Sequence, residues 1–133
     1  MTVIVRASSK AVFAPDQKST TVSDGYPADE LVAAFKGHDA VVLALSFEML
    51  SHATKFARAS VAAANKWLVA STYGANLEDP QHHLFPASIP HRQAVDELLQ
   101  LQVGQSDWGW TSISCGPWPE LSVLAPQYLC ALS

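Results

Sequence analysis

Short apolar runs alternate along this chain with longer segments whose apolar residues recur at helical spacing. Five runs rich in β-branched, aromatic or leucine residues are predicted as strands: residues 2–5, 19–22, 39–45, 67–70 and 110–115. The run 39–45 is continuously apolar and too short for a typical helix, which favours a strand buried on both faces of a parallel sheet. Residues 67–70 repeat this pattern.

Helical spacing predicts three helices, over residues 27–36, 48–64 and 92–102. Pro27 suits a first helical position, Gly37 suits a left-handed helix end, and Asn65 offers an end to the second helix. Residues 78–90 hold three prolines and are predicted as a loop. Strands separated by helices require crossover connections, so the pattern predicts an α/β fold with a parallel sheet.

Composition narrows the class of protein. The chain has 133 residues, of which 49% are hydrophobic, and it carries 8 Lys and Arg against 12 Asp and Glu. These values fit one domain with a real core. The basic residues are scattered, so we expect no nucleic-acid binding. No run approaches the roughly 18 apolar residues that cross a bilayer, and the N-terminal run is too short for an export signal, so we expect a cytoplasmic protein that binds no membrane.

The cysteines and histidines do not form a metal-binding pattern. Cys115 and Cys130 lie among apolar or small residues, which favours packed thiols, with a bridge between them as the alternative. His82 and His83 are adjacent, and neither they nor His91 has a partner at metal-ligand spacing. We therefore expect no metal site.

The residues that follow the strands are the first candidates for a binding site, because ligands of open α/β sheets lie at the carboxyl ends of the strands. These residues are Arg6, Asp24, Ser46, Ser71 and Pro117. An NAD site places an acidic residue near the ribose, whereas an NADP site places an arginine at the 2′-phosphate. The first strand ends in Arg6-Ala-Ser-Ser-Lys10. This basic segment fits a phosphate site, and a solvated strand end explains it equally well.

Three segments in order, residues 3–8, 29–42 and 66–74, resemble the NmrA-like, isoflavone-reductase-like family. They read Val-Ile-Val-Arg-Ala-Ser, Asp-Glu-Leu-Val-Ala-Ala-Phe-Lys-Gly-His-Asp-Ala-Val-Val and Lys-Trp-Leu-Val-Ala-Ser-Thr-Tyr-Gly. Residues 94–99 and 109–116 also resemble the family's later segment. The resemblance extends over residues 2–118, and residues 119–133 form a divergent apolar tail.

The resemblance implies a Rossmann-like, doubly wound parallel sheet that binds NADP. It places Arg6 and Ser8 at the adenosine phosphate, Leu45 and Ser46 near the adenine-side ribose, and Ser71 and Tyr73 near the nicotinamide. In the reductase branch a lysine at the start of the late helix assists proton transfer. Its position here is taken by Arg92, or by His91 if the register slips by one.

These substitutions change the expected chemistry. A guanidinium stays protonated in the ordinary pH range, so Arg92 can orient or stabilise charge but cannot donate a proton. His91 titrates in the useful range, and a helix-start residue without catalytic role is the alternative. The Tyr-x-x-x-Lys spacing of ordinary short-chain dehydrogenases does not follow Tyr73. That type of dehydrogenase is therefore disfavoured.

The family's opening strand and Gly-x-x-Gly-x-x-Gly loop, which bind the pyrophosphate, have no counterpart among the six dispersed glycines. In the strand order 3-2-1-4-5-6 the missing strand lies between residues 2–5 and 39–45. We therefore expect a gap in the sheet. Either the two halves close up, or the chain is marginally stable, or it is a truncated product.

Three functions remain open. The chain is related to NADP-dependent reductases that act on a small-molecule substrate, or it is an NADP-sensing or protein-interaction module, or it is an inactive fragment. Because Arg92 replaces the lysine, the sensing or interaction module is favoured over the reductase. The missing Gly-x-x-Gly-x-x-Gly loop weakens cofactor binding in both. We expect no turnover from the chain as it stands.

Overall fold

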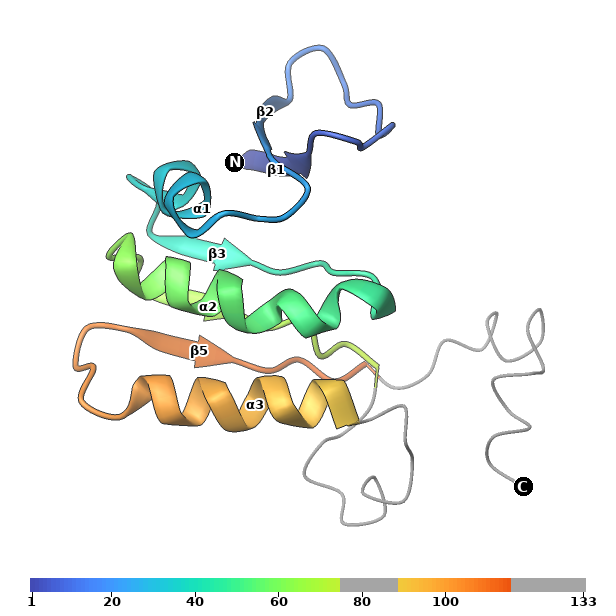
Figure 1. The fold of residues 1–133 in the computed structure, drawn as a ribbon. Coiled ribbons are helices and arrows are strands. Elements are labelled where there is room, and N and C mark those ends of the chain that lie inside the picture. The colour runs from blue at the N-terminus through green and yellow to red at the C-terminus, as the bar shows by residue number, and fades with distance from the viewer. Residues whose placement is uncertain (75–88, 116–133) are drawn as a thin grey trace, which may run out of the picture.

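The computed structural model describes residues 1–74 and 89–115, which form parallel β-sheets and a layer of helices (Figure 1). In chain order the elements are β1 (Thr2–Arg6), β2 (Lys18–Val22), α1 (Ala28–Phe35), β3 (Ala40–Val42), a 3-10 helix (Phe47–His52), α2 (Ala53–Ala62), β4 (Trp67–Val69), α3 (Ile89–Gln102) and β5 (Gly109–Thr111). The predicted strands and helices are confirmed in order and, with one exception, in type: the helix predicted over residues 48–64 begins as the 3-10 helix and is α-helical only from Ala53 to Ala62. Strands β3 and β5 are shorter than predicted, and α3 begins before the predicted start, at the end of the predicted loop. Most of that loop and the tail 119–133 lie outside the described residues.

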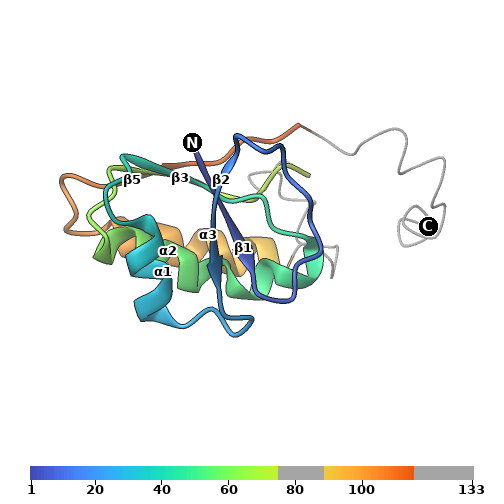
Figure 2. The ribbon, with the colours of Figure 1, turned by 90° about the horizontal axis from the view of Figure 1, so that it is seen from above.

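The strands form two sheets in this part of the chain. Strand β1 pairs with β2, and a second sheet has the order β3-β4-β5; both sheets are parallel. The α/β, Rossmann-like fold class is confirmed. The expected discontinuity falls between β1 and β3, and the β1–β2 pair runs across the direction of β3 and β5 (Figure 2). Direct closure of the two halves is therefore wrong for the described residues.

The hydrophobic core lies between the helices and the inner face of the three-stranded sheet. Leu31 of α1 and Leu68 of β4 are fully buried. They are surrounded by buried apolar residues from the helices and the strands: Phe35, Val41, Leu43, Phe56, Ala57, Ala59, Ala70, Leu98 and Trp108. Each large side chain in such a core contributes about 1.5–3 kcal/mol through the area it removes from water. This packing fixes the sheet on which the predicted site residues stand.

The described helices lie on one face of the three-stranded sheet (Figure 2). The opposite face carries apolar side chains in contact with solvent: Val42 is 65% exposed and Trp67 is 47% exposed. The expectation that residues 39–45 and 67–70 are buried on both faces is therefore wrong. On this open face the Trp67 ring lies over Gly109, where an added Cβ would come within 2.5 Å of it.

The end of α2 contains a left-handed residue one position earlier than predicted. Ala64 has φ of 57°, and the N–H groups of Ala64 and Asn65 donate to the carbonyls of Val61 and Ser60 at 3.0 and 3.1 Å. This is the Schellman arrangement of helix ends. The buried Asn65 side chain instead donates to the carbonyls of Phe35 and His38, at 3.0 and 2.5 Å. Asn65 thus joins the ends of α1 and α2.

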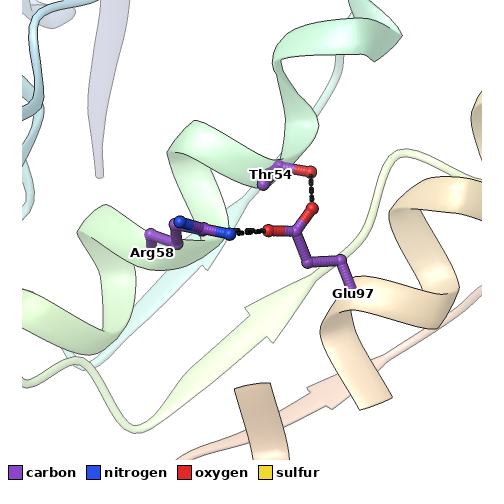
Figure 3. Close-up of polar contacts among 3 residues, drawn as sticks. All are labelled: Thr54, Arg58 and Glu97. Atoms are coloured by element: carbon purple, nitrogen blue, oxygen red, sulfur yellow. Dashed lines mark hydrogen bonds and ion pairs between the residues drawn. The ribbon is translucent and has the colours of Figure 1, made fainter. Parts of the chain in front are cut away.

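Helices α2 and α3 are joined by one carboxylate. Glu97 accepts a hydrogen bond from the Thr54 hydroxyl at 2.6 Å and pairs with the Arg58 guanidinium, whose Nε lies at 2.9 Å (Figure 3). Burial raises the pKa of Glu97, but the hydrogen bonds from Thr54 and Arg58 and the Arg58 charge outweigh it, so the pKa is lowered overall. The ionised form is therefore the one that stabilises the packing of these helices.

We predict that Ala64→Gly stabilises the fold by roughly 0.5–1 kcal/mol, because glycine adopts a left-handed conformation without the strain of a Cβ. The matched control is Ala62→Gly, which places glycine at the last residue of the same helix and is expected to destabilise the fold by up to about 1 kcal/mol. Urea unfolding followed by circular dichroism measures both changes. A loss of stability in Ala64→Gly contradicts the assigned helix end.

We also predict that Glu97→Gln lowers the free energy of unfolding at neutral pH by about 1 kcal/mol, since it removes a partly exposed charge-assisted contact. A carboxyl group with a lowered folded pKa stabilises the fold above its ordinary value of 4.5 and loses that effect as pH falls through the folded pKa. The difference between the variant and the original chain should therefore shrink below about pH 4 in urea titrations. Asp96→Asn on the same helix is the control, and a difference independent of pH argues against the Glu97 contact.

Candidate functional site

The carboxyl ends of β3, β4 and β5 lie at one edge of the three-stranded sheet, and α3 begins at the same edge (Figure 1). The strands end at the same edge because they are parallel: each crossover returns the chain to the opposite edge before the next strand starts. Leu45, Ser46, Ser71 and Tyr73 follow β3 and β4 and are thereby brought to this edge. His91 and Arg92 lie in the first turn of α3.

Ser71 joins the segments that follow β3 and β4. Its Oγ accepts a hydrogen bond from the Leu45 N–H at 3.0 Å and lies 3.3 Å from the Leu45 carbonyl oxygen, to which it donates. Ser71 is only 7% exposed, whereas Ser46 is exposed. The serine hydroxyl thus holds the Leu45 backbone in place and leaves Ser46 open to solvent.

Tyr73 makes a second contact between the same two segments. Its hydroxyl donates to the Leu43 carbonyl at 3.0 Å, and the N–H of Cys115 donates to the Tyr73 carbonyl at 3.0 Å. Burial, and secondarily the nearby Cys115 thiol, raises the pKa of the Tyr73 hydroxyl. Tyr73 therefore stays protonated in the ordinary pH range, with its proton directed to the backbone.

Thr72 and Ser112 were not predicted as site residues. Thr72 is 2% exposed, and its hydroxyl lies 2.7 Å from that of Ser112, which follows β5. Ser71 and Tyr73 thus bond to the segment that follows β3, and Thr72 bonds to the segment that follows β5. The run Ser71-Thr72-Tyr73 indicated that hydroxyl groups follow β4. The contact of Thr72 with Ser112 could not be predicted, because it depends on the register of β4 and β5.

Cys115 is exposed and has a free thiol. The expectation of a packed thiol is wrong for this residue, because β5 ends at Thr111 and the chain has already left the sheet. Cys130 lies outside the described residues, so a bridge between the two cysteines stays untested.

Arg6 and Ser8 stand on the separate β1–β2 pair. The segment after β1 turns through a hydrogen bond from the Ser9 N–H to the Arg6 carbonyl at 2.9 Å. The Ser8 N–H donates to Oδ1 of Asp24, two residues past the end of β2, at 3.0 Å. The Ser8 backbone and then its hydroxyl lower the pKa of Asp24, and the Arg6 charge adds to this. A cation, a donor N–H and an ionised carboxylate therefore lie together where β1 and β2 end.

A groove of about 490 Å³ lies between the β1–β2 pair and α1, and none of the predicted site residues lines it. Polar groups at its wall come from Thr20, Glu30, Lys36 and His38. In residues 1–74 and 89–115 no three potential metal ligands cluster, and no helix has the length and apolar character needed to cross a membrane.

The chain is similar to one curated protein, named Oxidoreductase aprR, from Aspergillus flavus. The two are 27% identical over 125 residues, which cover 92% of this chain but 41% of that protein. The chain thus spans less than half the length of this relative. No protein-family model matches the chain, and no solved structure matches it.

We predict that Ser71→Ala lowers the free energy of unfolding by about 1–2 kcal/mol, because it leaves the Leu45 N–H without its buried acceptor. Thermal and urea unfolding measure this change. Ser46→Ala is the control: it removes an exposed hydroxyl that makes no capping hydrogen bond to the 3-10 helix, so stability should change by less than about 0.5 kcal/mol. Equal effects of the two substitutions refute the proposed contact between the strand ends.

Proposed function

We propose that this chain is the dinucleotide-binding part of an oxidoreductase-like protein of the NmrA-like, isoflavone-reductase-like type, and that it binds NADP without turning over a substrate. Two observations support the proposal. The predicted binding residues lie at the ends of parallel strands, where Rossmann-like folds bind nucleotides. Arg6 and Ser8 stand at the end of β1 in the two-stranded sheet, and the others follow β3 and β4 in the three-stranded sheet. The chain also resembles a protein named as an oxidoreductase over 92% of its length.

The donor chemistry of the strand ends fits a dinucleotide. Arg6 is an exposed cation at the end of β1, and a guanidinium pairs well with a phosphate monoester. The exposed Ser46 offers a hydroxyl to a ribose, and Ser71 and Tyr73 lie on the next strand end. NADPH supplies a hydride when it is bound. Without a Gly-x-x-Gly-x-x-Gly segment for the pyrophosphate, affinity is expected to be micromolar or weaker.

The state of Tyr73 supports binding without turnover. A general acid for a reduction works best with a pKa near the operating pH and a proton within reach of the substrate. The pKa of Tyr73 is raised by burial, and its hydroxyl proton is directed to the Leu43 carbonyl. A guanidinium is a poor proton donor, so Arg92 does not take over this role.

Binding without chemistry suits a module that senses the dinucleotide or responds to it by contacting a protein partner. The competing function is reduction of a small-molecule substrate, with His91 as the group that supplies the proton. Oxidation of NADPH in the presence of small aromatic ketones separates the two functions. Turnover that is lost in His91→Gln establishes the reductase and refutes the sensing module.

We predict that calorimetric titration detects NADPH binding and that Arg6→Ala weakens it roughly tenfold, equivalent to about 1.4 kcal/mol. NADH binding should change much less, since it has no 2′-phosphate. Lys18→Ala is the matched control, because Lys18 pairs with Thr2 at the opposite end of the β1–β2 pair. Absence of NADPH binding to a chain shown by circular dichroism to be folded overturns the proposed function.

A further inference from the structure

The loop that follows β1 already holds an anion from the same chain. The Asp24 carboxylate accepts the Ser8 N–H at 3.0 Å and is close enough to Arg6 for the guanidinium charge to lower its pKa. A phosphate monoester seeks the same two kinds of partner, a backbone N–H and a guanidinium. The carboxylate therefore stands where a phosphate at this loop would make its contacts.

The position of Asp24 is fixed by its neighbours. The N–H and hydroxyl of Ser23 both donate to the Glu30 carboxylate, at 2.6 and 2.8 Å. The turn closes with a hydrogen bond from the Tyr26 N–H to the Ser23 carbonyl at 2.9 Å, and the Tyr26 ring packs 5.0 Å from that of Phe56. Asp24 is thus carried on a turn that is attached to both α1 and α2.

A charged competitor affects phosphate and hydroxyl ligands differently. A 2′-phosphate must displace the Asp24 carboxylate from Ser8 or remain near it, and two like charges a few ångströms apart repel each other even in water. A ribose 2′-hydroxyl has no charge and can donate a hydrogen bond to a carboxylate. Asp24 therefore works against the preference for phosphate that Arg6 provides.

We propose that the Asp24 carboxylate is an internal competitor for the 2′-phosphate and sets how strongly the loop of residues 6–9 distinguishes NADPH from NADH. This inference rests on the proposed function for the dinucleotide, but its central claim concerns the loop and a phosphate monoester. Asp24 is accordingly a specificity-determining residue that acts by occupying the Ser8 N–H and by its charge.

Asp24→Asn tests the inference because the amide is nearly isosteric, retains an oxygen that can accept the Ser8 N–H, and lacks the charge. We expect NADPH to bind Asp24→Asn roughly five- to tenfold more tightly than the original chain, and NADH to change less than about twofold. Asp107→Asn removes an exposed charge just before β5 and should change neither affinity. Calorimetry gives the affinities, and circular dichroism establishes that each variant is folded.

A second readout separates this inference from the proposed function. Adenosine 2′-monophosphate is titrated into both chains while the Ser8 amide is followed by NMR. If neither chain binds a dinucleotide but Asp24→Asn binds the monophosphate at Ser8 at least fivefold more tightly, the inference stands and the proposed function fails. If both dinucleotides bind and Asp24→Asn alters neither affinity, the inference fails alone. No saturable shift of Ser8 in either chain overturns the inference, whereas absence of NADPH binding in calorimetry overturns the proposed function.

Discussion

The structure depends on the pairing of β4 with a strand on each side. In the described residues β4 alone has two hydrogen-bonded neighbours, and its central residue, Leu68, is fully buried. The connections from β3 to β4 and from β4 to β5 advance in the same direction, and right-handed crossovers then place α2 and α3 on the same face. One constraint on handedness thus produces both the core under the helices and the apolar open face opposite them.

Two groups of polar contacts result from this arrangement, and they differ in character. After β3 and β4, the hydroxyls of Ser71 and Tyr73 are hydrogen-bonded to backbone groups. These bonds connect the two segments at the edge of the sheet, and they leave few hydroxyl hydrogens that could be donated to a substrate. After β1 and β2, Arg6, Ser8 and Asp24 are exposed, and Arg6 and Asp24 are charged. The first group of contacts holds the strand ends in place. The second group is available to a ligand, and its opposite charges, Arg6 and Asp24, lie near each other.

The sequence predicts the types and the order of the elements well because both depend on local patterns, such as the β-branched runs and Gly37, which has φ of 81°. It predicts strand ends less well, because the apolar runs 39–45 and 110–115 continue beyond the last paired residues, Val42 and Thr111. It does not distinguish a strand buried on both faces from one buried on a single face, because Val42 belongs to the same apolar run in either case. It also could not identify the contact of Asp24 with Ser8, which lie 16 residues apart and meet only through the parallel register of β1 and β2. Leu45 and Ser71 were predicted individually, but their hydrogen bond was not, for the same reason.

The position of Trp67 has a consequence for how this protein can be studied. Its indole lies over Gly109 and donates to the Thr111 hydroxyl at 3.1 Å, so its surroundings exist only when β5 is in register beside β4. Trp108, which is 5% exposed and donates to Ser60 of α2, depends instead on the core beneath the helices. Two of the chain's four tryptophans thus lie in different environments. In variants that replace the other tryptophans, their emission separates the addition of the last strand from the collapse of the interior.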